Sequence, residues 1–314
     1  MNDNLNYGPL RRVVVAGGTH GDEMAGVYLV RHWMQDPTEL GRTTVTAEPF
    51  LANHMAVKKR VRYIGQDLNR SFEEITLRAL DSENDTYEER RAREINQHYG
   101  PRGSAGACDF VIDLHNTTAN MGSTILIMSP DDHIAMHLSN YLQIHSVDSS
   151  SPCHVIIARE MTREPCSLMT LGKHAVVLEV GPQPHGVVKA DILNRMRALV
   201  KCSLDFIDLY NQGAEFPAFG MEAYEVLERV DYPRDAAGHL LAVIHPKLQD
   251  KDYLPVNPGD PLFQMLNGHE VLYDGDVTMY PAFINEAAYY EKKVAFIKMK
   301  RVGYSVPAIR LNHE

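Results

Sequence analysis

Over its first two thirds, the chain alternates between short apolar runs and segments with helical spacing of apolar residues. The runs are rich in Val, Ile and Leu and lie at 11–17, 108–115, 123–128, 154–158 and 175–181. Their apolar residues follow one another instead of strictly alternating with polar ones, which is typical of strands buried on both faces. We therefore expect a buried sheet built from these five segments.

Three segments carry apolar residues at every third or fourth position, the period of an amphipathic helix. They span residues 23–34, 131–142 and 189–213, and the last ends on Gly213, a common helix stop. Residues 81–100 are dense in mixed charge and are expected to form a solvated helix with its connecting loop. Strands that alternate with helices predict the α/β class.

After Gly213 the pattern changes to short strand-like pieces separated by Pro, Gly, Asn and Asp. Such pieces with turn residues between them are typical of a β-rich fold. We therefore divide the chain into an α/β domain at 1–213 and a smaller β-rich domain at 214–314.

Charge and composition narrow the classes of partner. The formal net charge is −10, which disfavours non-specific binding to nucleic acid or to anionic membranes. No window reaches the roughly 18 to 20 apolar residues of a membrane span, and the first residues lack a secretory apolar region. The four cysteines show no C-x-x-C spacing, so we expect a cytoplasmic protein, with peripheral membrane association left open.

Polar residues follow several predicted strands, where the ligands of open α/β sheets bind. His20 and Glu23 follow the first strand in "GGTHGDE", and His115 ends "FVIDLH". Two His and one Glu are a known ligand set for zinc in hydrolases, with one position left for water. A lone His at a strand end is more often a hydrogen-bonded core residue, and the sequence alone leaves that alternative open.

Two further segments carry candidate chemistry. "RYIGQDLNR", residues 62–70, places Arg62, Asn69 and Arg70 in a stretch without strong helical or strand pattern, as in a binding loop for a carboxylate; the alternative is an ordinary surface loop. Glu179 lies in the apolar run "AVVLEV", where burial should raise its pKa and suit it to act as a general base. The alternative is a buried Glu paired with an Arg.

Two aspartates have equally open roles. Asp113 lies two residues before His115, and so on the same strand face, where it could orient a ligand imidazole or pair with a neighbouring base. Asp67, in the 62–70 segment, has the same ambiguity.

Five motifs together resemble the aspartoacylase and aminoacylase III family of zinc amidohydrolases, which have a carboxypeptidase-like mixed sheet flanked by helices. The motifs are "GGTHGDE", "RYIGQDLNR", "DLHNTTANMG", "LEVGPQPHG" and "MYPAFINEAAYYEKK". The resemblance runs from about Arg11 to Lys293, and it implies a C-terminal domain that helps to close the active site.

The resemblance also implies roles for single residues. It implies that His20, Glu23 and His115 bind one zinc ion per chain, and that Glu179 is the base and proton shuttle. Arg62 would stabilise the oxyanion. Asn69, Arg70 and Tyr289 would hold the substrate carboxylate, and Tyr289 and Lys293 would reach into the pocket from the C-terminal domain; Arg62 and Lys293 are also expected to bind substrate.

One departure bears on the substrate. Aspartoacylase has an arginine for the aspartate side chain ten residues before the base glutamate, and here that position is Met169. Arg159 or Arg163 could replace it only if the loop folds differently. We therefore expect the N-acyl-aromatic-L-amino-acid amidohydrolase branch, which deacylates N-acetylated aromatic amino acids and mercapturates.

Three other functions stay open at this stage: aspartoacylase acting on N-acetylaspartate, a zinc carboxypeptidase, and a non-catalytic binding protein with the same fold. We expect a small-molecule N-acyl amino acid as substrate and no nucleic-acid partner. Homo-oligomers are common in such families, and we expect one here.

Overall fold

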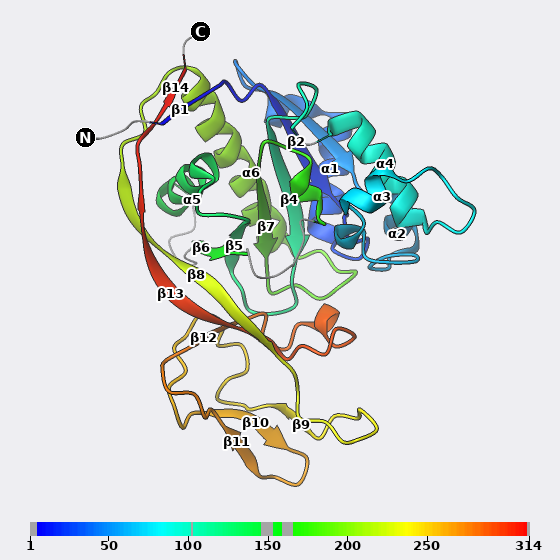
Figure 1. Ribbon diagram of the computed structural model, residues 1–314, viewed down its shortest axis with the longest axis vertical. Coiled ribbons are helices and arrows are strands. Elements are labelled where there is room, and N and C mark those ends of the chain that lie inside the picture. The colour runs from blue at the N-terminus through cyan, green and yellow to red at the C-terminus, as the bar shows by residue number, and fades with distance from the viewer. Residues whose placement is uncertain (1–4, 102, 146–152, 159–165, 313–314) are drawn as a thin grey trace.

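The computed structural model describes residues 5–101, 103–145, 153–158 and 166–312. Its centre is a nine-stranded sheet with the order β12-β13-β8-β6-β5-β7-β4-β2-β3 (Figure 1). The strands of its α/β half are β2 (Arg12–Gly17), β3 (Thr46–Leu51), β4 (Phe110–Asn116), β5 (Ser123–Ile127), β6 (Cys153–Ile157) and β7 (His174–Val180). The remaining three are β8 (Phe219–Val230), β12 (Tyr280–Ala282) and β13 (Phe296–Val306).

The sheet is mixed, as the family resemblance implies. Strands β3, β2, β4 and β7 are parallel, whereas β5 runs antiparallel to β7. Parallel strands end at the same edge, so the carboxyl ends of β2, β4 and β7 bring together residues that are far apart in the chain.

Helices cover both faces of the sheet. One apolar core joins alternate sheet residues such as Val13, Ile112 and Leu178 to α1 (Met24–Gln35), α5 (His133–His145) and α6 (Ala190–Asn211). The intervening residues, such as Val14 and Val111, face a second core that includes α4 (Tyr87–Tyr99). The shorter helices are α2 (His54–Lys59) and α3 (Glu74–Arg78).

The C-terminal part extends the central sheet and also contains a small sheet of its own. β8 pairs in parallel with β6, and β13 pairs antiparallel with β8 along eleven positions, so both strands extend the central sheet. In Figure 1 this long pair runs from the chain termini down to a small sheet, which is formed by β9 (Ala242–Ile244), β10 (Pro261–Met265) and β11 (Glu270–Leu272). At the upper end, β14 (Ile309–Leu311) pairs with β1 (Leu5–Tyr7).

The five strands and three helices expected from the apolar pattern are all present, with ends shifted by a few residues. The pattern missed β3 and α2, which are short and partly polar. The charged segment 81–100 does contain a helix, α4, but it is not simply solvated, since Glu88 is fully buried and Arg93 is 5% exposed. Among the described residues, no helix combines the length and the apolar character needed to cross a lipid bilayer.

Candidate active site

The turn between β2 and α1, residues 18–23, places two of the predicted metal ligands. We call this turn the metal turn. His20 lies within it, and Glu23 is its last residue, directly before α1. Gly21 lets α2 pack directly on the turn, because a Cβ at this position would lie 2.1 Å from the backbone carbon of Ala56. Gly18 has a φ of +69°, a left-handed conformation that favours glycine.

The side chains of His20, Glu23 and His115 converge on one point. The Nδ1 atoms of His20 and His115 lie 3.1 Å apart. Each of these atoms faces a different oxygen of Glu23, at 2.7 Å from His20 and 2.9 Å from His115. All three residues are at least 95% buried. The structure therefore brings together the three residues that the sequence proposed as metal ligands, and they form a group that could hold a metal ion.

Two aspartates fix the orientation of the imidazoles. Nε2 of His20 lies 3.1 Å from Oδ1 of Asp67, and Nε2 of His115 lies 2.8 Å from Oδ2 of Asp113. A ring that donates its Nε2 proton to a carboxylate keeps the Nδ1 lone pair free for a metal. Asp113 is itself held by the hydroxyl of Thr19, which donates to Oδ1 at 2.7 Å.

This donor set fits a divalent cation. With the protons on Nε2, two nitrogen lone pairs and a carboxylate face one another inside a buried site, which is unfavourable without a positive charge between them. Burial alone would raise the pKa of Glu23, but the positive charge of protonated His20 and His115 outweighs that effect and holds the pKa well below its usual range. A divalent cation would supply this positive charge in place of the ring protons. Glu23 is therefore ionised, as a metal ligand must be.

The 62–70 segment lies beside the metal group and is not an ordinary surface loop. Arg62 is 15% exposed; its Nη1 donates to Oε1 of Glu23 at 3.1 Å, and its Nη2 lies 3.7 Å from Oδ2 of Asp67. Asn69 is 9% exposed, and its Nδ2 lies 3.3 Å from Nε2 of His115. Arg70 is exposed but also lines the cavity.

A buried carboxylate that the sequence did not single out anchors this loop. Glu88 on α4 accepts hydrogen bonds from the backbone N–H groups of Ile64, Gly65 and Gln66 at 2.7 to 3.3 Å. It also accepts one from Nδ2 of Asn53 at 3.0 Å. The capping box at Thr86 and Glu89 marks the helix start, but no local pattern distinguishes Glu88 from the neighbouring Glu89, which is only half-buried.

Glu179 lies on β7 in register with His115 of β4. Among the described residues its Oε2 has no hydrogen-bond partner, and no arginine forms an ion pair with it. Burial, with Glu23 and Glu286 nearby, raises the pKa of Glu179 to about 8. Among the described residues Glu179 therefore has no arginine ion-pair partner, and its Oε2 is free to accept a proton.

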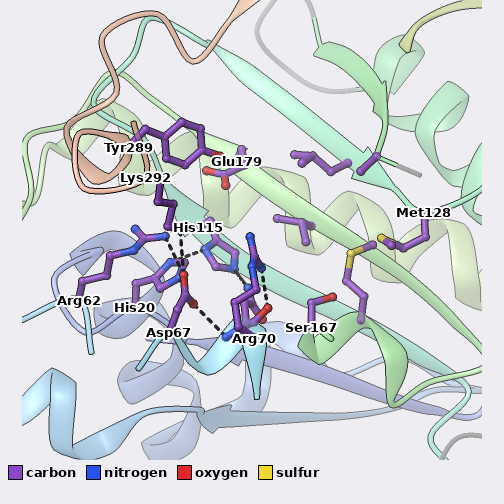
Figure 2. Close-up of a pocket in the computed structure, with 15 residues that line it drawn as sticks. His20, Arg62, Asp67, Arg70, His115, Met128, Ser167, Glu179, Tyr289 and Lys292 are labelled. Carbon is purple, nitrogen blue, oxygen red and sulfur yellow. Dashed lines mark hydrogen bonds and ion pairs between the residues drawn. The ribbon is translucent and has the colours of Figure 1, made fainter. Parts of the chain in front are cut away.

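His20, His115, Glu179 and the residues Arg62, Asp67, Asn69 and Arg70 line one cavity. Its volume is about 660 Å³, counting the space open to solvent. Figure 2 shows its two ends: Arg62, His20, Asp67 and Lys292 gather at one, and Met128 lies at the other. The cavity also has apolar lining residues, Leu126, Ala158, Met169 and Val177, which belong to one hydrophobic cluster against which Met128 packs.

The segment 283–293, which we call the C-terminal cover, contributes Tyr289 and Lys292 to the cavity. Lys292 donates to Oδ2 of Asp67 at 3.0 Å, and burial lowers its pKa. Lys293, the lysine chosen from the sequence, is exposed and does not line the cavity. The two lysines are adjacent, and the backbone turn at Lys293, with a φ of 56°, decides which of them faces inward.

Met169 lines the cavity and is 7% exposed, so a thioether lies where aspartoacylase was expected to need an arginine. Arg159 and Arg163, the possible replacements for that arginine, lie outside the described residues.

Comparison with known proteins agrees with the fold and shows its family. Residues 9–207 match the succinylglutamate desuccinylase/aspartoacylase catalytic domain, and residues 219–301 match the AstE/AspA barrel-sandwich hybrid domain. The chain belongs to the succinylglutamate desuccinylase/aspartoacylase family.

Within this family, the chain is similar to N-acyl-aromatic-L-amino acid amidohydrolase (carboxylate-forming) of Xenopus tropicalis, with 55% identity over 100% of both chains. Aspartoacylase of Mus musculus is 44% identical over 96% of both chains. The crystal structure of murine aminoacylase 3 superposes with a TM-score of 0.94 at 48% identity, covering 97% of this chain and 100% of that one.

Proposed function

We propose that this protein is a zinc-dependent amidohydrolase that removes the acyl group from N-acyl-L-amino acids with apolar or aromatic side chains. N-acetylated aromatic amino acids and mercapturates are the expected substrates, and a carboxylate and a free amino acid are the products. The proposal is supported by the relatives named as amidohydrolases and by the cavity beside the His-Glu-His group.

The zinc ion would be held by three side chains. His20 and His115 would each bind it through Nδ1, and Glu23 would bind it through its carboxylate. Bound zinc lowers the pKa of a water molecule and polarises a carbonyl oxygen. Asp67 and Asp113 keep both imidazoles in the tautomer that such binding requires.

Glu179 would act as the general base. Its carboxylate would take a proton from the water that attacks the acyl carbonyl and would then pass it to the leaving amine nitrogen. Its raised pKa and its oxygen without a hydrogen-bond partner among the described residues suit both transfers. Arg62 would donate to the oxygen that becomes negative as the water attacks.

The cationic end of the cavity would bind the carboxylate of the substrate. Arg70 and Lys292 supply positive charge there, and Asn69 and Tyr289 supply neutral donors. Because the whole chain carries a net charge of −10, capture of an anion depends on this local group.

The preference for a substrate with an apolar or aromatic side chain rests on one observation, the apolar residues that line the cavity. Met128 and Met169 are flexible, polarisable side chains that pack well against aromatic rings and thioethers. An aspartate side chain packed against these apolar residues would lose hydration of its carboxylate, which is costly.

The test compares N-acetyl-L-tyrosine with N-acetyl-L-aspartate as substrates of the zinc-loaded protein. We expect the higher kcat/KM for N-acetyl-L-tyrosine. Met169→Arg should narrow or reverse the preference, whereas Met169→Leu, which keeps the wall apolar, should not. A wild-type preference for N-acetyl-L-aspartate would show that the chain is an aspartoacylase, the function of a relative 44% identical to it.

A further inference from the structure

His185 joins three parts of the active site. It lies in the loop after β7, with Nδ1 3.3 Å from Oδ2 of Asp22 and Nε2 3.4 Å from Oε1 of Glu286. Asp22 belongs to the metal turn, and Glu286 lies in the C-terminal cover, directly before the short helix η5 (Ala287–Tyr289). The imidazole of His185 therefore lies between the metal turn and the cover.

Other contacts fix the backbone of Asp22 and the carboxylate of Glu286. The backbone N–H of Gly186 donates to the carbonyl oxygen of Asp22 at 2.7 Å, which ties the His185 loop to the metal turn. Oε2 of Glu286 accepts from the hydroxyl of Thr117 and from the backbone N–H groups of Thr118 and Ala119, the latter two at 2.7 and 3.1 Å. His185 therefore faces one anchored carboxylate, Glu286, and a second, Asp22, whose Oδ1 has no hydrogen-bond partner among the described residues.

This geometry favours a charged ring. A neutral imidazole carries one proton, so one of its nitrogens would present a lone pair to a carboxylate, whereas an imidazolium presents N–H to both. The charged groups that face His185 are Asp22 and Glu23 from the metal turn and Glu286 from the cover. Glu286 contributes most to raising the pKa of His185 above its usual value of 6.5, and burial opposes this rise only in part.

We propose that His185 is a positioning residue that acts as an imidazolium between Asp22 and Glu286 and holds the C-terminal cover against the metal turn. The inference rests on the proposed function, because the cover carries Tyr289 and Lys292, which we assign to the substrate carboxylate. Loss of the proton leaves two carboxylates facing each other without a cation, so the cover is held less firmly. KM then rises. The value of kcat depends on Glu179, whose pKa is about 8, and on the metal group, so the pH dependence of kcat should be the same in the wild type and in His185→Gln.

The first test measures KM and kcat for N-acetyl-L-tyrosine between pH 6 and pH 9. In the wild type, KM should rise with pH through the raised pKa of His185, since protonation is lost on the alkaline side. His185→Gln should raise KM about fivefold at neutral pH, the size of one lost charge-assisted contact, and should flatten this rise. His245→Gln removes a His–Glu contact of 3.0 Å in the small sheet and should leave both constants unchanged.

A second test identifies the partner of His185. If His185 acts through Glu286, then His185→Gln should raise KM much less in the Glu286→Gln protein than it does in the wild type. An equal rise in both backgrounds would overturn the proposal, as would a wild-type KM that His185→Gln leaves unchanged at every pH.

A third test does not depend on turnover. Histidine NMR of the zinc-loaded protein, with the His185 signal identified by its loss in His185→Gln, should give a titration midpoint above 6.5 that falls in Glu286→Gln. A midpoint at or below 6.5 overturns the inference. If the wild type fails to hydrolyse N-acetyl-L-tyrosine, the proposed function fails, and this titration still decides whether His185 is the charged link.

Discussion

At the scale of single residues, the site depends on pairs in which one side chain sets the state of another. Asp67 and Asp113 accept from the Nε2 atoms of His20 and His115 and so leave both Nδ1 atoms directed at Glu23. Glu179 has no such partner among the described residues, and burial raises its pKa to about 8. The same buried region thus keeps Glu23 ionised and gives Glu179 a strong affinity for a proton.

Glu179→Gln tests the assigned base. The amide cannot accept a proton, so kcat should fall by about 10²- to 10⁴-fold. KM and zinc content should stay close to those of the wild type, because Glu179 is not among the metal-binding group. Steady-state kinetics and metal analysis check this result, and a variant that keeps most of its activity would exclude Glu179 as the base.

Metal content tests the ligand set. The wild type should hold about one zinc ion per chain, and His20→Ala or His115→Ala should lose it after dialysis, since each removes one of three ligands. His239→Ala, at an exposed histidine paired with Asp235, is the matched control and should retain zinc. Equal zinc in all four proteins, measured by elemental analysis, would contradict the assignment.

At the scale of elements, polar contacts between segments place the loops around the sheet. The loop at 62–70 is shaped by Glu88 from α4, which accepts from three consecutive backbone N–H groups. The C-terminal cover is held in a similar way, because the backbone N–H of Ile284 donates to Oδ1 of Asp252 at 3.0 Å. In both cases one buried carboxylate replaces the hydrogen bonds that a strand or helix would have supplied.

Glu88→Ala should therefore destabilise the protein. It leaves buried N–H groups unpaired and should lower the free energy of unfolding by about 3 kcal/mol. Glu94→Ala on the same helix removes an exposed carboxylate and should cost less than about 0.5 kcal/mol. Urea unfolding of the two variants gives the comparison, and equal losses would show that the loop does not depend on Glu88.

Asp252 predicts a pH dependence of stability. Burial raises its pKa to about 7 from a usual value of 3.8, so the folded state holds a proton that the unfolded chain has released. Its contribution to stability is thus present at pH 4 and is lost as the pH rises to 7. Asp252→Asn should remove this pH-dependent loss of stability, which is on the order of 2–4 kcal/mol. In urea unfolding, the variant should therefore be more stable than the wild type at pH 8 but not at pH 4. An equal difference in the free energy of unfolding between variant and wild type at both pH values would contradict the raised pKa of Asp252.

At the scale of the whole molecule, the C-terminal third completes both the sheet and the site. β8 and β13 extend the sheet beyond β6, and the cover supplies Tyr289 and Lys292 to a cavity whose other walls come from the first 180 residues. The division at residue 213 that the sequence pattern suggests therefore lies between two parts of the chain that form one central sheet and line one cavity together.

A fragment of residues 1–213 should not fold on its own. It would expose an unpaired edge at β6 and the apolar residues that pack against Val226, Phe283 and Met299. Circular dichroism during thermal unfolding should show no cooperative transition for the fragment, in contrast to the full chain. A cooperative transition would support two independent domains.

Much of the central fold could be predicted from local pattern. The apolar runs and helical spacing gave β2, β4, β5, β6, β7, α1, α5 and α6, because burial leaves a periodic signal in the sequence. The five motifs gave the family, and the residues at strand ends gave a His-Glu-His group that could hold a metal ion, since parallel strands end at one edge.

Other features were decided only by tertiary structure, because they depend on contacts between residues far apart in the chain. Sequence pattern could not choose between Lys292 and Lys293, since a single backbone turn determines which side chain faces the cavity. It could not single out Glu88 or His185 either, because their partners lie 22 or more residues away and no periodic signal links them. The chain determined by itself which segments are buried and which chemistry is available; the packing of distant segments decided which charges meet.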